Sequence, residues 1–260
     1  MEHQTNITGS HRRVLVDWLA QVSFKYHLLQ ETMILTVDIL DRYLQIVIVP
    51  KPMLQLVGLA SLLISSKVEE IYAPSVYDLV YISAHTYTRE EVLKMEKTIL
   101  HELDFRILKP YPLHFLRRYS RLARTDTNIH HLAKYFIDLS LLETETSSLL
   151  PSKKAAAAFI LASSLANVQL YGTSGKKVWT KDLVRHSGYN FVQLKDPVTV
   201  LLRAMATRHL VDNAKAIRER YVKNAPTEQV KSLIKTELEK TITAADHKRV
   251  ISIIAEQTES

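Results

Sequence analysis

Four basic side chains in the middle of the sequence have a spacing that suits anion binding. His130 and Lys134 are four residues apart, which places them on one face of a helix. Arg117 lies in the preceding helical segment, one turn from Arg121. If the two helices are antiparallel neighbours, Arg117, His130 and Lys134 form a basic pocket of phosphate size. The spacing alone is equally compatible with an ordinary solvated basic face.

Residue types that perform catalysis or bind metals are present, but their spacing does not build a site. His130 and His131 occupy adjacent helical positions about 100° apart, so the two rings cannot share one metal ion. The loop at 172–177 lacks the spacing of a phosphate-binding loop and the Ser or Thr that follows its lysine. Glu69 and Glu70 have no neighbour that indicates acid–base catalysis. We therefore expect no catalytic residue, no metal and no cofactor.

The composition excludes several further classes of protein. The 260 residues include no cysteine, which excludes a disulfide scaffold, a thiolate zinc site and an iron–sulfur cluster. Five glycines give a Gly-rich nucleotide-binding fold little support. No apolar run reaches the roughly 18 residues of a membrane span, and the first ten residues lack a secretory signal. The formal net charge of +7 favours either anionic partners or a soluble surface rich in Lys and Arg.

Helical periodicity dominates the chain and divides it into two similar halves. In each half the third expected helix is the most apolar, which is typical of a central buried helix. Each of these central helices begins just after a proline, Pro50 or Pro52 in the first half and Pro151 in the second. Thr88 and Glu91 form a capping box that opens the fifth helix. The expected segments are 14–22, 32–47, 53–66, 75–82 and 88–103, followed by 113–124, 129–142, 151–168, 180–186 and 191–211.

The sequence thus predicts an all-α protein with two tandem five-helix domains, each around a central buried helix. Strand signals are weak, because only residues 46–49 are β-branched and that run is too short to define a sheet. The expected organisation is an N-terminal segment (1–10), a first domain (11–108), a second domain (109–211) and a C-terminal helical extension (212–260).

Several ordered motifs along the chain resemble the cyclin box, and the resemblance covers about residues 11–211. The motifs of the second half are similar to the second box of B-type mitotic cyclins. The quoted segments are Arg12-Arg13-Val14-Leu15-Val16-Asp17-Trp18-Leu19, Leu29-Gln30-Glu31-Thr32, Asp41-Arg42-Tyr43-Leu44, Leu54-Gln55-Leu56-Val57-Gly58, Ser66-Lys67-Val68-Glu69-Glu70, Met95-Glu96, Pro112-Leu113-His114-Phe115-Leu116-Arg117-Arg118 and Leu132-Ala133-Lys134-Tyr135.

The resemblance implies a non-catalytic subunit that binds and activates a cyclin-dependent serine/threonine kinase at the G2/M transition. In this family the first box holds the αC helix of the kinase inward, so that the kinase's own Lys–Glu ion pair forms. The family usually has an aromatic residue where Val68 stands. Two alternatives stay open: Leu100 and Phe105 could be core residues, and Lys67 could simply pair with Glu96. The positions that match the family's kinase contacts are Lys67, Val68, Glu69, Glu96, Leu100 and Phe105.

Two other sets of residues take their roles from the resemblance. Arg12 and Asp41 match a buried ion pair between the first two helices, which is structural. B-type cyclins are similar at Arg117, His130 and Lys134, where they bind phosphorylated partners.

A substrate-docking patch for Arg-x-Leu segments is also implied. The chain departs from the family pattern at His11, and it has Gln21 and Lys51 where an acidic residue often neutralises the docking arginine. Docking of a basic peptide is therefore expected to be weakened. Because Leu15 and Trp18 also belong to the apolar stripe of the first helix, a core-only role stays open. The matching residues are Leu15, Trp18, Leu54 and Gln55.

The principal alternative function is nucleic-acid binding by a double five-helix protein of the TFIIB type, which the positive net charge would suit. The cyclin-type pair Lys67 and Glu96 favours the kinase activator, because a DNA-binding protein does not require it. We therefore expect a kinase heterodimer, with Arg-x-Leu or phosphorylated proteins as further partners, no membrane association, and a location in the cytoplasm and nucleus.

Overall fold

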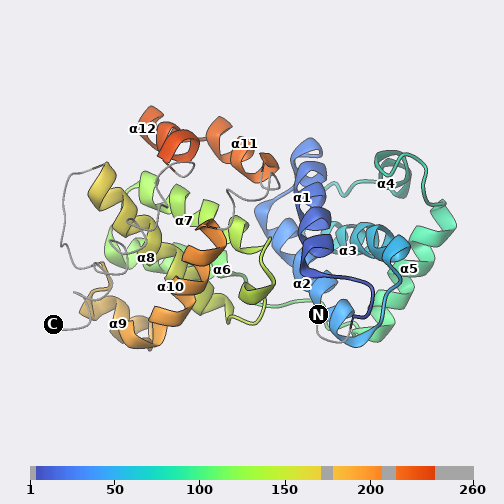
Figure 1. The fold of residues 1–260 in the computed structure, drawn as a ribbon, viewed down its shortest axis with the longest axis horizontal. Coiled ribbons are helices and arrows are strands. Elements are labelled where there is room, and N and C mark those ends of the chain that lie inside the picture. The colour runs from blue at the N-terminus through green and yellow to red at the C-terminus, as the bar shows by residue number, and fades with distance from the viewer. Residues whose placement is uncertain (1–3, 171–177, 207–214, 238–260) are drawn as a thin grey trace. The chain divides into compact units, whose positions relative to one another are not determined.

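The computed structural model describes residues 4–170, 178–206 and 215–237, and within these ranges it contains helices and no strand (Figure 1). The chain divides into two compact units. Unit 1 comprises Met1–Lys109 with Leu141–Ser147, and unit 2 comprises Pro110–Ser140 with Ser148–Ser260. The predicted all-α class is confirmed.

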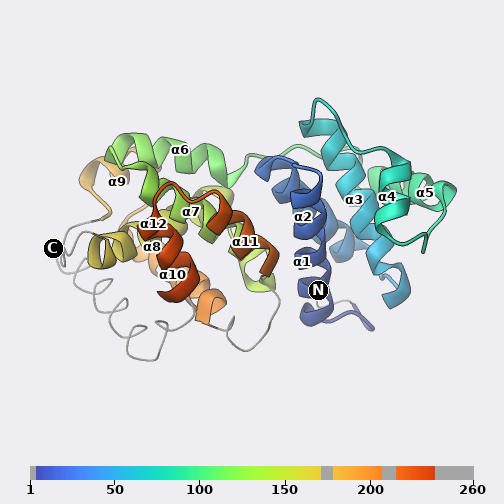
Figure 2. The same ribbon diagram turned by 90° about the horizontal axis from the view of Figure 1, so that it is seen from above.

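Unit 1 is built around α3, which contacts α1, α2, α4 and α5 (Figure 2). Helix α3 is buried on every side from Leu56 to Ser66, which explains why its sequence is apolar nearly all round. A short 3-10 turn, η1 (Lys51–Met53), leads into it. The five helices are α1 (Gly9–Lys25), α2 (Gln30–Ile46), α3 (Leu54–Glu69), α4 (Val76–Ile82) and α5 (Arg89–Glu102).

Side-chain caps fix where three of these helices begin. The predicted capping box of α5 is confirmed: Thr88 accepts a hydrogen bond from the Glu91 amide, and Glu91 accepts one from the Thr88 amide. Ser75 caps α4 in the same way. In α1 the box pairs Thr8 with His11, so the imidazole faces the start of its own helix.

Unit 2 repeats this plan around α8, which contacts α6, α7 and α10. The run Ala155–Ala158 has no exposed surface, so the neighbouring helices approach this side of α8 closely. A 3-10 turn, η2 (Thr144–Thr146), lies in the connection before α8. The five helices are α6 (Pro112–Ala123), α7 (Thr127–Ser140), α8 (Pro151–Gln169), α9 (Lys181–Ser187) and α10 (Phe191–Ala206).

The C-terminal extension packs on unit 2 through α11 (Lys215–Lys223), α12 (Glu228–Ser232) and the π-helical turn η4 (Leu233–Glu237). Ile217, Val230 and Ile234 are buried, so the extension has an apolar face that unit 2 covers. Helix α11 contacts α7, beside which it lies in both views (Figure 1, Figure 2).

Some features differ from expectation or lie outside the described part of the chain. In the β-branched run 46–49, Ile46 ends α2 and the other three residues form no strand, in agreement with the weak strand signal. The segment 141–147 falls in the range assigned to the second domain, whereas its contacts place it in unit 1. The loop at 172–177 and residues 207–214 and 238–260 lie outside the described residues. None of the helices described here is both long and apolar enough to span a bilayer.

Candidate partner-binding surfaces

Lys67 and Glu96 form an ion pair that joins the end of α3 to α5, with Nζ 2.5 Å from Oε1. Glu96 is buried, whereas the Lys67 side chain keeps 49% of its exposure. The ammonium therefore gives one donor to the buried carboxylate and can offer its other donors to a partner. The intramolecular pair and a partner contact are compatible at this position.

Exposed apolar side chains occur on α3 next to Lys67 and in the turn that follows α5. Val68 follows Lys67 on α3 and is 44% exposed, whereas Leu100 on α5 and Glu69 are half-buried. Phe105 is 65% exposed, so it is not a core residue. Its backbone has a left-handed φ of 55°, and its amide donates to the Leu100 carbonyl at 2.9 Å. This turn after α5 holds the ring outward, with its edge toward His101.

Ile71 and Tyr72 are two further exposed apolar residues, which the sequence reasoning missed. Both are 91% exposed, directly after α3 ends. Large exposed apolar residues next to a half-exposed ion pair in the sequence are candidates for contact with a protein partner. Their signal in the sequence is two large apolar residues in a stretch without helical periodicity.

The predicted docking patch is divided between core and surface. Leu15 and Leu54 are buried, and Leu15 packs so closely on α3 that a Cβ at Gly58 would lie 2.9 Å from its Cδ1. Trp18 and Gln55 are half-buried and are therefore the accessible members of the set.

Val14, which belongs to the apolar stripe of the first helix in the sequence, is exposed next to Trp18 rather than buried. It is 55% exposed and lies four residues before Trp18, on the same face of α1. The residues that depart from the family pattern have local partners: His11 binds Thr8, and Gln21 donates to Asp17 at 3.1 Å. Neither supplies a negative charge to a docking arginine.

A pocket of about 510 Å³ in unit 2 contains two of the three predicted phosphate-binding residues. His130 and Lys134 line it from α7, and His131 lines it as well. Arg121 also lines the pocket from α6, one turn from Arg117. Arg117 is not a lining residue, but its positive charge acts on His130, so it lies near the other two predicted residues.

His130 is oriented by Ser120, whose hydroxyl lies 2.8 Å from Nδ1. Burial lowers the pKa of His130 below its ordinary 6.5, and the positive charges of Lys134, Arg117 and His131 lower it further. The imidazole is therefore mainly neutral at pH 7, and a bound anion would favour its protonation. Within the described residues, no group of three side chains is suited to hold a metal ion.

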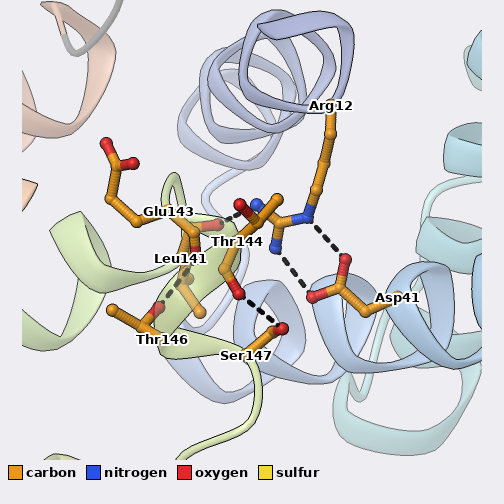
Figure 3. Close-up of polar contacts among 7 residues, drawn as sticks. All are labelled: Arg12, Asp41, Leu141, Glu143, Thr144, Thr146 and Ser147. Atoms are coloured by element: carbon orange, nitrogen blue, oxygen red, sulfur yellow. Dashed lines mark hydrogen bonds and ion pairs between the residues drawn. The ribbon is translucent and has the colours of Figure 1, made fainter. Parts of the chain in front are cut away.

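Arg12 and Asp41 form a structural pair inside unit 1 (Figure 3). Arg12 is 1% exposed and binds both carboxylate oxygens, at 2.5 and 2.7 Å. Its third donor reaches the Leu141 carbonyl at 2.9 Å. The adjacent Arg13 binds Glu143 at 2.6 Å, so two arginines of α1 hold the segment 141–147.

Two family models together match nearly the whole chain. The cyclin N-terminal domain matches residues 1–108, and the cyclin C-terminal domain matches residues 110–235. The chain belongs to the cyclin family. The resemblance proposed from the motifs is therefore confirmed, and each five-helix unit corresponds to one cyclin domain.

Curated relatives of this cyclin include proteins named G2/mitotic-specific cyclin-B. The protein of Spisula solidissima is 48% identical over 73% of this chain, and that of Patella vulgata is 40% identical over 83%. Human G2/mitotic-specific cyclin-B2 is 36% identical over 88%. The matched region covers 42%, 50% and 58% of these relatives, so the chain spans about half of their length.

A solved structure has the same fold. The viral cyclin of herpesvirus saimiri aligns with a TM-score of 0.64 at 26% identity, covering 77% of this chain and 89% of the viral protein.

Proposed function

We propose that this cyclin is the regulatory subunit of a cyclin-dependent serine/threonine kinase and that it acts at the G2/M transition. The observation that carries the proposal is the ion pair of the half-exposed Lys67 with the buried Glu96, together with the exposed apolar residues Val68 and Phe105 on or directly after the same two helices. The B-type relatives support the mitotic assignment. The cyclin itself performs no chemistry, and its effect is to stabilise the active conformation of the kinase.

The proposed mechanism uses the separate properties of these residues. Phe105 and Val68 supply apolar area, whose burial is worth roughly 25 cal/mol per Å². Lys67 donates to carbonyl groups at the end of a partner helix, where the helix dipole is negative. A kinase αC helix bound here is held inward, so that its Glu can pair with the catalytic Lys of the kinase. Activation is then a population shift toward the bound conformation.

A binding measurement tests the interface. The affinity of the cyclin for a purified monomeric cyclin-dependent kinase is measured by calorimetry, with wild-type protein and with Phe105→Ala. Because a central anchor contributes about 2 kcal/mol or more, we expect at least a thirtyfold weaker Kd for Phe105→Ala. Lys97→Ala is the matched control, since Lys97 is exposed on α5 next to Glu96. Equal affinity of Phe105→Ala and wild type would contradict the assigned surface.

The pocket in unit 2 supports a second proposed role, the recognition of phosphorylated proteins. Arg121 and Lys134 provide permanent positive charge, and His130 provides a ring nitrogen that can gain a proton. A phosphoserine or phosphothreonine is the ligand class that this charge favours. Such a site would recruit phosphorylated substrates or regulators to the kinase complex.

The α1 surface supports a third proposed role, the docking of an apolar segment. Trp18 and Val14 are accessible and can contact an aliphatic side chain such as the Leu of an Arg-x-Leu segment. Lys51 is the first residue of η1 and is exposed. Its positive charge would repel the arginine of an Arg-x-Leu segment. We therefore expect peptides in which the arginine is replaced by a neutral residue to dock at least as well.

A further inference from the structure

The C-terminal extension contributes to the pocket that contains Arg121 and Lys134. Pro226, in the turn between α11 and α12, lines this pocket together with residues of α6 and α7. The extension lies about a hundred residues further along the chain, and its sequence carries no phosphate-binding motif. Its place in the pocket therefore depends on how α11 is held against α7.

Tyr221 connects α11 to α7 by three kinds of contact. Its hydroxyl donates to Asp138 Oδ2 at 2.9 Å, inside the protein. Its backbone carbonyl lies 3.1 Å from His131 Nε2, so this nitrogen carries the proton and donates. Its ring also contacts the rings of His131 and Tyr135, with centroids 5.1 and 5.2 Å away. Burial and the nearby Asp138 raise the pKa of Tyr221 well above its ordinary value, so the hydroxyl keeps its proton.

His131 links this anchor directly to the pocket. It is a lining residue, and the ring nitrogen that donates to Tyr221 fixes how the imidazole is turned. Loss of the Tyr221 carbonyl from this position would release the ring of His131. The orientation of one pocket residue is therefore set by the extension.

Thr227 is a second anchor, on the other side of Pro226. Its hydroxyl donates to Asn128 Oδ1 at 3.3 Å, and it also caps α12 by accepting from the Val230 amide. The turn that contains Pro226 is thus held at both ends, by Tyr221 and by Thr227. This arrangement keeps the turn against the first turn of α7, where the pocket lies.

We propose that the C-terminal extension is a wall of the phosphate-binding pocket and that Tyr221 is the positioning residue that holds this wall in place. The inference rests on the phosphate recognition proposed above and adds that residues 215–232 are required for it. The wall reduces the access of water to one side of the pocket, which strengthens the attraction between Lys134 and a phosphate. Release of the extension leaves the basic residues in place but exposes them to solvent.

The test measures binding of a fluorescein-labelled peptide that contains one phosphoserine among alanines. The Kd is determined by fluorescence anisotropy and is compared with the Kd of the same peptide without the phosphate. Tyr221→Ala is expected to raise the Kd of the phosphopeptide about tenfold, which is 1.4 kcal/mol. Tyr221→Phe keeps the ring contacts and is expected to fall between wild type and Tyr221→Ala. Gln229→Ala, which changes an exposed residue of α12, is the control and is expected to match wild type.

Three further measurements separate the wall from the pocket itself and from misfolding. Thr227→Val changes an exposed residue and so leaves the core intact. It is expected to raise Kd at least threefold, because the hydrogen bond to Asn128 and the cap on the Val230 amide are both lost. Limited proteolysis is expected to cleave the extension of Tyr221→Ala faster than that of wild type. Kinase activation is expected to be unchanged in both variants, because the assigned kinase surface lies in unit 1.

The outcomes distinguish the two proposals. If Lys134→Ala abolishes phosphopeptide binding while Tyr221→Ala and Thr227→Val bind with wild-type affinity, the pocket binds phosphate but the C-terminal extension is not required for it. If wild type does not distinguish the phosphopeptide from its unphosphorylated form, the proposed phosphate recognition is wrong and the wall is refuted with it. Weaker binding by all three variants supports both.

Discussion

Arg12 and Asp41 are joined by two hydrogen bonds that bring the guanidinium and the carboxylate into bidentate contact, 29 residues apart in the sequence (Figure 3). The same arginine donates to the carbonyl of Leu141, 129 residues further along the chain. One buried side chain therefore ties α1 both to α2 and to the connection between α7 and α8.

We predict that Arg12→Met lowers the free energy of unfolding by about 3–5 kcal/mol, because Asp41 loses its counter-charge in a largely buried site. The measurement is urea unfolding followed by circular dichroism. Arg42→Ala is the control, since its 3.5 Å pair with Asp38 is more exposed and is worth about 1 kcal/mol or less. Equal effects of the two substitutions would show that the Arg12 junction is not special.

The close contact between Gly58 and Leu15 can be tested by its effect on stability. The change in the free energy of unfolding caused by Gly58→Ala is expected to have opposite signs with Leu15 present and with Leu15 replaced by Ala. In the wild type, Gly58→Ala gains about 1 kcal/mol of helix propensity but meets Leu15 at 2.9 Å, where overpacking costs about 1–3 kcal/mol. We expect a net loss of up to about 2 kcal/mol. In a Leu15→Ala background the clash is gone, and Gly58→Ala is expected to stabilise by about 1 kcal/mol. A double-mutant cycle measured by urea unfolding checks this, and additive effects would contradict the close contact.

Binding of a phosphopeptide is predicted to strengthen as pH falls from 8 to 6.5. The pKa of His130 is lowered in the free protein by burial and by the nearby positive charges. The negative charge of a bound phosphate raises this pKa, so the imidazole takes up a proton on binding, which favours binding at the lower pH. Below about pH 6 the phosphate itself gains a proton and the gain ends. Calorimetry in buffers of different ionisation heat measures the proton uptake. His130→Ala is expected to flatten the profile between pH 8 and 6.5, and an unchanged profile in that variant would exclude His130 as the titrating group.

The lowered pKa of His130 also predicts how stability depends on pH. The unfolded chain binds a proton at this residue near its ordinary pKa of 6.5, whereas the folded protein binds it only at lower pH. Stability contributed by neutral His130 is therefore present above pH 6.5 and decreases as pH falls below that value. Urea unfolding at pH 7.5 and pH 5.5, with wild type and His130→Ala, measures the difference, and the variant is expected to lose less stability on acidification.

A comparison of Phe105 with Leu103 tests whether Phe105 serves partner binding rather than folding. They are two residues apart at the end of α5, but Phe105 is 65% exposed and Leu103 is 4% exposed. Phe105→Ala is expected to change the free energy of unfolding by less than about 0.5 kcal/mol, whereas Leu103→Ala is expected to cost about 2–5 kcal/mol. Urea unfolding of both variants measures these changes in the free energy of unfolding. A large loss of stability in Phe105→Ala would mean that the ring is a structural residue.

The helices could be predicted from the sequence because their signals are local. The apolar run of α3 and the capping box of Thr88 with Glu91 each depend on residues within a few turns of one another. Lys67 and Glu96 could be paired only through the family resemblance, since they are 29 residues apart. The contact of Arg12 with Leu141 has no local signal at all, because it depends on where the segment 141–147 runs after folding.

The residues of the pocket could likewise be predicted where they share one helix, and not where they depend on how two helices pack. His130 and Lys134 share a helix face that spacing alone reveals. What α6 contributes depends on how it is rotated against α7: Arg121 lines the pocket, and Arg117 acts on His130 through its positive charge. Exposure behaves similarly: Leu15, Val14 and Trp18 have similar apolar character in the sequence, yet packing buries the first and leaves the others accessible.

We propose above all that the surface around Lys67 and Glu96 activates a kinase. The most direct measurement adds the cyclin to a purified, otherwise inactive cyclin-dependent kinase and follows the phosphorylation of histone. Replacing both residues, Lys67→Ala with Glu96→Ala, avoids leaving the buried Glu96 charge without its partner. We predict strong activation by wild type and by Lys97→Ala, and none by the double variant, with unchanged helical content in all three. Full activation by the double variant would show that the surface around Lys67 and Glu96 does not activate the kinase.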